Sequence, residues 1–355
     1  MGRIVEGDWH ITMDTLIVGT GALATLFAAR LSAAGHSITM LGTWRSGLEA
    51  LKKNGARLVD SNGVESAYRV NVTDNPRDCL GARYALVLVK SWQTERAARQ
   101  LGECLAEDGL AVTLQNGLGN RETLVKFLDA PVLTAKDNGV QRLPTLDVGN
   151  HAEVWRLRTP VKTLTASRVA LGTTTTGATL LGPGLVRAGG EGILSIERHP
   201  ALGPLEEALL SARFNLQIVD DAQSLIWGKL VINAAINPLT ALLRVSNGEL
   251  LERPAAREVM GALARETADV ATAERVTLPF SNPVHAAEDV ARKTAGNHSS
   301  MFQDVRRGAP TEIDAICGAV ARRGEKHGIA TPYNRACWKL VRAAVSVPVS
   351  SPLAN

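Results

Sequence analysis

The chain has 355 residues, and at about 150 residues per domain this length predicts two domains. Apolar residues make up 45% of the chain and charged residues 21%, a balance that excludes the disordered and fibrous classes. The net charge of +4 comes with no run of five or more like charges, so we expect neither nucleic acid nor a membrane as a partner.

The chain opens with an apolar stretch, residues 16–34, whose composition is similar to that of a membrane helix. Acidic residues rather than a positive flank precede it, and it contains Gly19 and Gly21 in a pattern typical of nucleotide-binding loops. We therefore interpret the stretch as part of a soluble fold, and residues 1–12 as an N-terminal extension.

Strands and helices alternate through the first third of the chain. Apolar runs predict strands at 15–18, 37–41, 84–89 and 110–114. Helical patterns follow at 25–34, 47–54, 93–105 and 121–128. Continuous apolar strands between amphipathic helices are typical of a parallel sheet that is covered on both faces.

The later chain is first irregular, then β, then helical. An irregular insert is expected at about 130–168, and β character returns over 170–198, where glycines punctuate the sequence. A last strand is expected at 215–219. The predicted fold class is α/β, with an N-terminal Rossmann-type parallel-sheet domain over 13–219, an all-α C-terminal domain over 220–348 and a tail over 349–355.

The loop after the first predicted strand carries a dinucleotide-binding fingerprint. Its residues are Gly19, Thr20, Gly21, Ala22, Leu23 and Ala24. In such a loop one glycine forms the tight turn, the second lets a pyrophosphate approach, and a small third residue allows helix–strand contact. The helix N-terminus then presents free N–H groups to the diphosphate. A strand–turn–helix without a ligand is the alternative, but the position in the chain favours a cofactor.

The end of the second predicted strand indicates which cofactor is expected. An NAD enzyme places Asp or Glu there to bind the ribose 2′-hydroxyl, whereas this segment reads Gly42, Thr43, Trp44, Arg45 and Ser46. Arg45 can bind a 2′-phosphate through two N–H groups. The alternative is a solvated loop arginine; we favour NADP(H) over NAD.

Two further strand ends supply polar side chains to the same edge of the sheet. Lys90 follows one predicted strand and Asn116 follows the next. The carboxyl ends of strands in an open α/β sheet line the ligand cleft, so both residues are candidates for cofactor contacts. Asn116 with Gly117 is also a favourable turn in its own right.

A polar stripe crosses an apolar helix in the C-terminal half. Lys229, Asn233 and Asn237 recur every four residues, which places them on one helix face. The residues around them are apolar and predict a buried helix. A buried lysine is costly unless it meets a partner or a ligand. We expect Pro238 to end or kink this helix. The alternative is a lysine that reaches solvent beside two internally bonded asparagines.

Two short blocks downstream combine helix-start signals with polar residues. Ser300 with Gln303 reads as a capping box, and Thr311 with Asp314 as a looser helix start. Glu312 is either a first-turn acid or a functional carboxylate, and spacing does not decide between them.

The cysteines and histidines predict no metal site. Cys79, Cys104, Cys317 and Cys337 include no C-x-x-C pair, and the seven histidines form no H-E-x-x-H arrangement. Free thiols are typical of a reducing cytosol, so we expect a cytoplasmic protein.

These motifs make the chain resemble the ketopantoate reductase (2-dehydropantoate 2-reductase) family from residue 13 to about 340. The resemblance rests on the fingerprint at Gly19, on Lys90, Gln115-Asn116-Gly117, the Gly-Pro-Gly at Gly182, Trp227-Gly228-Lys229 with Asn233 and Asn237, and the blocks Ser299-Ser300-Met301-x-Gln303-Asp304 and Thr311-Glu312-Ile313-Asp314. The chain departs from the family in its longer stretch at about 130–168, in its N-terminal extension and in the Gly-Thr-Trp-Arg that ends the second strand.

The resemblance implies NADPH-dependent reduction of 2-dehydropantoate to (R)-pantoate, in pantothenate and coenzyme A biosynthesis. It implies Lys229 as general acid, with Glu312 and Asn116 as further catalytic residues. It implies substrate binding by Asn233, Asn237, Ser300 and Glu312, and cofactor binding by the fingerprint residues with Lys90 and Asn116.

Two other functions remain open at this point. A related NADP-dependent reductase of a different 2-oxo acid has the same signals, and a non-catalytic NADP(H)-sensing protein shares the fingerprint. Lys229 and Glu312 argue against a sensor, because sensing needs no buried acid. The expected partner is a small 2-oxo acid, and a homodimer is compatible with the sequence.

Overall fold

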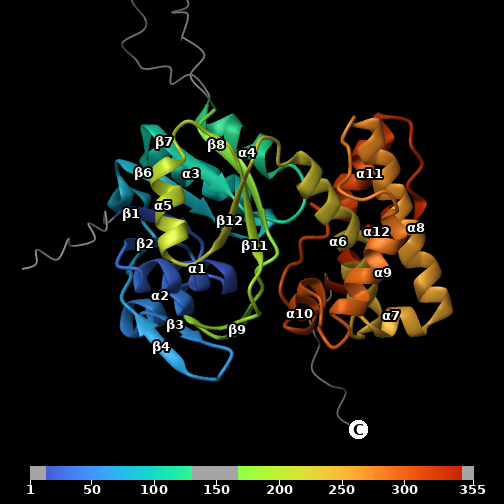
Figure 1. Ribbon diagram of the computed structural model, residues 1–355, viewed down its shortest axis with the longest axis horizontal. Coiled ribbons are helices and arrows are strands. Elements are labelled where there is room, and N and C mark those ends of the chain that lie inside the picture. Colours follow the sequence, from blue (N-terminus) through green and yellow to red (C-terminus); the bar gives the residue numbers. More distant parts are fainter. Residues whose placement is uncertain (1–12, 130–166, 346–355) are drawn as a thin grey trace, which may run out of the picture.

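The computed structural model describes residues 13–129 and 167–345. It has an α/β domain and a helical domain side by side (Figure 1). The expected extension at 1–12, the expected tail at 349–355 and nearly all of the expected insert at 130–168 lie outside the described residues. The predicted fold class is confirmed.

A mostly parallel sheet forms the centre of the α/β domain. Its eight strands are β1 (Asp14–Val18), β2 (Ser37–Leu41), β5 (Asn71–Thr73), β6 (Ala82–Val87), β7 (Leu105–Thr113), β8 (Val169–Thr174), β11 (Ile193–Glu197) and β12 (Asn215–Val219). Their order is β12-β11-β8-β7-β6-β1-β2-β5. The strands from β5 to β8 run parallel, and β11 pairs antiparallel with β8. The order reverses between β1 and β6, as in dinucleotide-binding sheets.

Helices cover both faces of this sheet, which explains why its central strands are continuously apolar. The helices are α1 (Ala22–Ala33), α2 (Arg45–Asn54), α3 (Thr94–Cys104), α4 (Asn120–Leu128) and α5 (Gly203–Ser211), with short 3₁₀ turns η1 (Pro76–Cys79) and η2 (Ser91–Gln93). Phe27 of α1 and Leu209 of α5 pack in one core cluster. Leu101 of α3 and Leu124 of α4 pack in another, on the opposite face.

A second, smaller sheet was only half predicted. Its strands are β3 (Ala56–Val59), β4 (Glu65–Tyr68), β9 (Ala178–Gly182) and β10 (Leu185–Ala188), in the order β4-β3-β10-β9. The last two fall in the segment expected to be β. The strands β3, β4 and β5 were not predicted, because each is only three or four residues long and polar residues interrupt its apolar ones.

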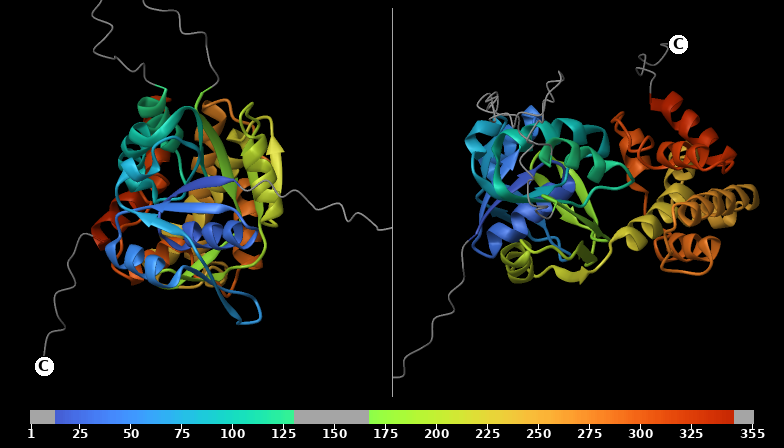
Figure 2. Two further views of the ribbon diagram at one scale, coloured as in Figure 1. Left: turned by 90° about the vertical axis from the view of Figure 1, so that its left-hand side faces the viewer. Right: turned by 90° about the horizontal axis from the view of Figure 1, so that it is seen from above.

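The helical domain is built around one long helix. Its elements are α6 (Gln223–Leu243), α7 (Glu249–Glu252), α8 (Pro254–Ala273), α9 (Pro283–Lys293), α10 (Ser300–Arg306), α11 (Cys317–Lys326) and α12 (Pro332–Val345). The chain passes from the α/β domain into this domain through α6 (Figure 2). Among the described residues, α6 alone is long and apolar enough to cross a membrane, but 67% of its most apolar window is buried inside the fold. It is therefore a core helix by position.

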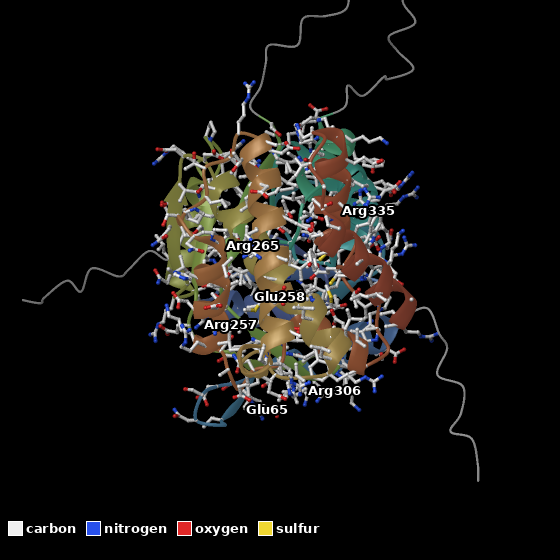
Figure 3. All side chains as sticks on the ribbon, turned by 90° about the vertical axis from the view of Figure 1, so that its right-hand side faces the viewer. Glu65, Arg257, Glu258, Arg265, Arg306 and Arg335 are labelled. Atoms are coloured by element: carbon white, nitrogen blue, oxygen red, sulfur yellow. The ribbon has the colours of Figure 1, made fainter. Side chains whose placement is uncertain are left out.

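The outward face of the helical domain is strongly charged. Figure 3 shows Arg257, Glu258 and Arg265 of α8 on this face. Arg257 donates two hydrogen bonds to Glu288 of α9, at 2.6 and 2.9 Å. The opposite face of α8 contributes Met260 and Leu263 to the core. This division is typical of a surface helix over an apolar centre.

Of the two outcomes expected at Pro238, an end of the helix or a kink, the helix end was wrong. The helix continues through Pro238 to Leu243. Proline has no N–H for the carbonyl four residues earlier, which here is that of Ala234. The Cys317 thiol lies 4.0 Å from this carbonyl oxygen and points a weak donor toward it. Tertiary packing therefore tolerates the proline inside the helix.

The two helix-start assignments after residue 298 also need correction. The cap of α10 is Ser299, whose Oγ accepts from the Phe302 N–H at 3.1 Å, and Ser300 is the first helical residue. The next helix, α11, begins only at Cys317, so Thr311 and Glu312 lie in the turn before it. Glu312 is consequently not a first-turn acid.

Candidate active site at the domain junction

The glycine-rich loop lies where the strand order reverses. Gly19 adopts φ +132°, and a Cβ there would lie 3.1 Å from the Leu88 carbonyl carbon and oxygen. Gly21 precedes α1 in extended conformation, and nothing lies within 4 Å of the position its Cβ would take. The first turn of α1 contains no acidic residue. The N–H groups of this turn have no partner within the helix, and the space at Gly21 lies beside them, an arrangement suited to an anion.

Arg45 is the first residue of α2, close to this loop in the fold. Its side chain is 93% exposed and its Nε donates to Glu49 at 3.0 Å. An exposed pair of this kind contributes little to stability. The guanidinium is therefore available to an anionic ligand, at a strand end that carries no acid.

Lys90, Asn116 and Glu312 form one polar cluster between the domains. The Asn116 amide donates to Glu312 Oε2 at 3.0 Å, and the Ser91 N–H donates to Glu312 Oε1 at 3.1 Å. Lys90 Nζ lies 3.6 Å from Glu312 and donates to Asp304 Oδ2 at 2.7 Å. Glu312 is only 5% exposed. Three groups of the α/β domain thus converge on one buried carboxylate of the helical domain.

The charge of Lys90 is maintained by its surroundings. Burial alone would lower the pKa of Lys90, but the carboxylates of Glu312 and Asp304 outweigh it and hold this pKa above its ordinary value. Asp304 is itself held by Arg307 at 2.6 Å. The cluster is therefore a charged network in which the ions satisfy one another.

Lys229 reaches across the junction from α6 to the sheet. Its Nζ donates to the backbone oxygen of Thr174, the last residue of β8, at 2.7 Å. Burial lowers the pKa of Lys229 to about 8, although the Glu312 carboxylate acts in the opposite direction. The amine and Glu312 are thus electrostatically coupled in one site.

The other residues of the stripe leave hydrogen-bonding capacity unused. Asn237 is 7% exposed and Asn233 is half-buried. Neither side chain bonds to another described residue, and the same holds for the exposed hydroxyl of Ser300. Neighbouring Ser299 instead bonds to Thr240 of α6 at 2.7 Å, which fixes α10 against α6. The amides therefore have capacity for a ligand.

A cleft of about 570 Å³ opens beside this cluster. It lies between the loop after β7, the first turns of α6 and the segment after α8, and its lining includes Leu118, Trp227 and Arg323. Its lining includes Gln115, Gly117 and Trp227 of the motifs, but none of the residues to which the sequence assigned a catalytic, substrate-binding or cofactor-binding role.

Sequence reasoning gave no role to three groups of the site. Thr174 and Ser91 contribute backbone atoms, which no side-chain pattern reveals. Asp304 stood in a recognised block without a role, yet it is 2% exposed and carries the Lys90 contact. Its signal is an acid placed among apolar residues of a helix that also contains Met301 and Phe302.

Comparisons with known proteins identify the family. The family model "Ketopantoate reductase PanE/ApbA" matches residues 15–201, and "Ketopantoate reductase PanE/ApbA C terminal" matches residues 221–345. The 2-dehydropantoate 2-reductase of Archaeoglobus fulgidus is 34% identical over 93% of this chain and 97% of its own length. That of Halobacterium salinarum is 32% identical over 94% and 99%.

Solved structures agree with this result. A PanE/ApbA family ketopantoate reductase from Ralstonia eutropha JMP134 superposes with a TM-score of 0.79 at 28% identity, covering 94% of this chain and 98% of that one. D-mandelate dehydrogenase, solved with NADH and anilino(oxo)acetate, shares the fold with a TM-score of 0.78 at 23% identity over 94% and 98% of the two chains. The chain therefore belongs to the ketopantoate reductase family, and it is an oxidoreductase.

Proposed function

We propose that this chain reduces 2-dehydropantoate to (R)-pantoate with NADPH, a cytoplasmic step of pantothenate and coenzyme A biosynthesis. Curated relatives bearing the name 2-dehydropantoate 2-reductase support the substrate. The Lys229 amine, which reaches from α6 to the sheet, and the buried Glu312 carboxylate, which Asn116 of the α/β domain contacts, support the reaction class. The four buried, unbridged cysteines are compatible with a reducing compartment.

The glycine-rich loop fits a nicotinamide dinucleotide. The open space at Gly21 and the N–H groups of Ala22, Leu23 and Ala24 are suited to the diphosphate. Arg45, at the end of β2, would bind the 2′-phosphate, which favours NADP(H) over NAD. Lys90 and Asn116, at the ends of β6 and β7, would contact the cofactor toward its nicotinamide end.

Reduction of a 2-oxo acid requires a hydride at the carbonyl carbon and a proton at its oxygen. A reduced nicotinamide supplies the hydride when bound. Lys229 holds the proton: with a pKa of about 8, its amine is mostly protonated at pH 7. Three N–H donors sit on an ammonium, and the Thr174 carbonyl takes one of them. The others are free to bind the substrate oxygen, and such general acid catalysis contributes about 10²–10⁴-fold.

Glu312 orients the substrate in this proposal. Its oxygens accept from Ser91 and Asn116, and a carboxylate has further acceptor sites for a substrate hydroxyl. A site that binds a hydroxyl this way rejects analogues without it by about 10⁴–10⁵-fold. Asn233, Asn237 and Ser300 offer polar groups without partners among the described residues for the remaining substrate oxygens.

The single observation that carries the proposal is the Lys229 amine at the domain junction, bonded to Thr174 and within the electrostatic influence of Glu312. The test is NADPH consumption by the purified protein with 2-dehydropantoate, repeated with Lys229→Ala. We expect turnover by the wild type and a loss of kcat of about 10²–10⁴-fold in the variant. Lys293→Ala, which removes an exposed lysine of α9, is the control and keeps full activity.

Two other outcomes separate the alternatives. A panel of 2-oxo acids identifies a related reductase if another acid turns over and 2-dehydropantoate does not. A non-catalytic NADP(H) sensor binds cofactor, turns over no acid, and keeps its biological role with Lys229→Ala.

A further inference from the structure

Trp44 belongs to the Gly-Thr-Trp-Arg segment after β2, where this chain departs from the family pattern. It immediately precedes α2, in extended backbone conformation, and Arg45 follows it. Its indole lies flat against Gly47 in the first turn of α2. A Cβ at Gly47 would touch Trp44 Cε3 and lie 2.9 Å from Cδ2 and 3.0 Å from Cζ3. Only glycine leaves room for the ring at this place.

The Trp44 indole packs against α2 on one side, but much of its surface is exposed to solvent. Trp44 remains 39% exposed, and it has no aromatic neighbour among the described residues. Large aromatic groups normally bury their faces, because their apolar area is the main part of what they contribute. The ring packs against Gly47 in the first turn of α2, and its exposed part offers apolar area to a flat ligand; we call the Trp44 ring the platform.

This platform adjoins the dinucleotide loop. Gly19 N–H donates to the Leu41 oxygen at 2.8 Å, and a Cβ at Gly42 would lie 2.6 Å from Thr20 Cγ2. The ends of β1 and β2 are therefore in direct contact, three residues before the indole. In dinucleotide-binding sheets this strand end receives the adenosine ribose.

We infer that the indole of Trp44 is a stacking platform for the adenine ring of the dinucleotide, beside the 2′-phosphate site at Arg45. The inference rests on the proposed use of NADP(H). The ring that would stack on Trp44 is adenine rather than nicotinamide. In the proposed reaction the nicotinamide has to reach the carbonyl group of the 2-oxo acid beside Lys229. Bases stack on aromatic faces through their π surfaces, without hydrogen-bond readout. The contact thus adds affinity for the adenosine half and leaves the chemistry unchanged.

The experiment measures binding of adenosine 2′,5′-bisphosphate, which carries adenine and a 2′-phosphate but no nicotinamide. Calorimetric titration gives the Kd, and tryptophan fluorescence gives a signal from the ring itself. We expect Trp44→Ala to raise the Kd about tenfold, which corresponds to about 1.4 kcal/mol. Trp44→Phe, which keeps an aromatic face, weakens binding less. Because Trp44→Phe removes the indole at this position, this variant also loses the change in tryptophan fluorescence that the ligand induces.

Gly47→Ala provides a second, independent variant. Its methyl group displaces the indole without removing it, and Gly47 has no positive φ that would strain an alanine. We expect it to raise the Kd in the same direction as Trp44→Ala, with unchanged circular dichroism. The matched control is Trp338→Phe in α12, a tryptophan of the helical domain.

The outcomes separate this inference from the proposed function. If the wild type binds neither NADPH nor the bisphosphate, the proposed function itself fails. If the wild type binds both and Trp44→Ala binds equally well, only the platform is refuted. Loss of the fluorescence change in Trp92→Phe rather than Trp44→Phe would also refute it, because Trp92, 50% exposed after β6, would then be the ring in contact.

Discussion

At the scale of single residues, burial of Lys229 disfavours its charged form and lowers the pKa of the amine into the range in which it can release a proton. We expect kcat for reduction to fall as pH rises through about 8, the value to which burial lowers the pKa of this amine. Above that pH the group has lost the proton it must donate, so activity drops tenfold per further pH unit. A pH–rate profile with saturating substrates measures this. A profile that stays flat up to pH 10 would contradict the assignment.

The same pKa predicts a gain in stability when the charge is removed. A lysine whose pKa is lowered on folding opposes folding while it is protonated, and stability rises with pH between the folded and unfolded pKa values. A fall from 10.5 to about 8 corresponds to about 3 kcal/mol. We therefore expect Lys229→Met, although inactive, to have a higher Tm at pH 7 than the wild type. The gain should shrink when calorimetry is repeated near pH 10.

Glu312→Gln tests the carboxylate at constant shape. The variant keeps one oxygen as an acceptor but loses the negative charge that faces Lys90 and Lys229. Hydrogen bonds to a charged group contribute about 1.5–3 kcal/mol, so kcat/KM for the oxo acid should fall by about 10- to 100-fold. The lowered pKa of Lys229 should fall further in the variant. An unchanged kcat/KM would show that the Glu312 carboxylate does not bind the substrate.

Arg45→Ala tests the choice of cofactor. Loss of the guanidinium should weaken NADPH more than NADH, because only NADPH carries the 2′-phosphate. Glu49→Ala is the matched control: it frees Arg45 from its 3.0 Å contact, and NADPH should bind as well as before or better. Equal effects of Arg45→Ala on the Kd of both cofactors would refute the phosphate role.

At the scale of elements, two glycines of one loop should behave differently. Gly19→Ala places a methyl against the Leu88 backbone at φ +132°, so we expect a loss of stability of about 1–3 kcal/mol. Gly21→Ala meets no protein atom within 4 Å, so the Tm should hold while the Kd for NADPH rises. Calorimetry and titration on both variants measure the contrast. A lowered Tm in Gly21→Ala would mean that the space is not reserved for a ligand.

Much of the fold was predictable from local patterns, and the exceptions have physical causes. Strong apolar runs such as β6 identified the central sheet, because burial on both faces leaves a continuous signal. β4, whose residues are exposed or half-buried, leaves none. Pro238 was misread because the neighbours that stabilise α6 beyond it are distant in sequence. The pattern at Ser300 predicts the helix cap one residue too late, within the normal ambiguity of helix ends.

At the scale of the whole molecule, contacts across the junction hold the domains together. Lys90 with Asp304, Glu312 with Asn116, and Leu118 N–H with the Ala315 oxygen all connect the sheet to the helical domain. These partners are separated by more than a hundred residues. Sequence patterns named Lys90, Asn116 and Glu312 individually, but only the tertiary structure shows that they meet.

Asp304→Asn should therefore destabilise the molecule as a whole. Asp304 is 2% exposed and carries two cations at 2.7 and 2.6 Å. The side chains of Lys90 and Arg307 are 37% and 43% exposed, so water can solvate both cations in the variant. The loss is then that of hydrogen bonds to a charged group, about 1.5–3 kcal/mol, which calorimetry would register as a lower Tm. Asp289→Asn breaks an exposed pair with Arg292 and should change the Tm by no more than a degree or two. Equal Tm values for both variants would show that the Asp304 ion pairs at the junction do not stabilise the fold.

The continuity of α6 through Pro238 has a mechanical consequence. Lys229, Asn233 and Asn237 sit on a single unbroken rod, so their mutual spacing is set by helix geometry alone, at about 6 Å per step along the axis. Any tilt or slide of that rod relative to the sheet moves the Lys229 amine and the two amides as one unit. In the proposed reaction, the angle of this one helix would therefore adjust all three of these substrate contacts at once.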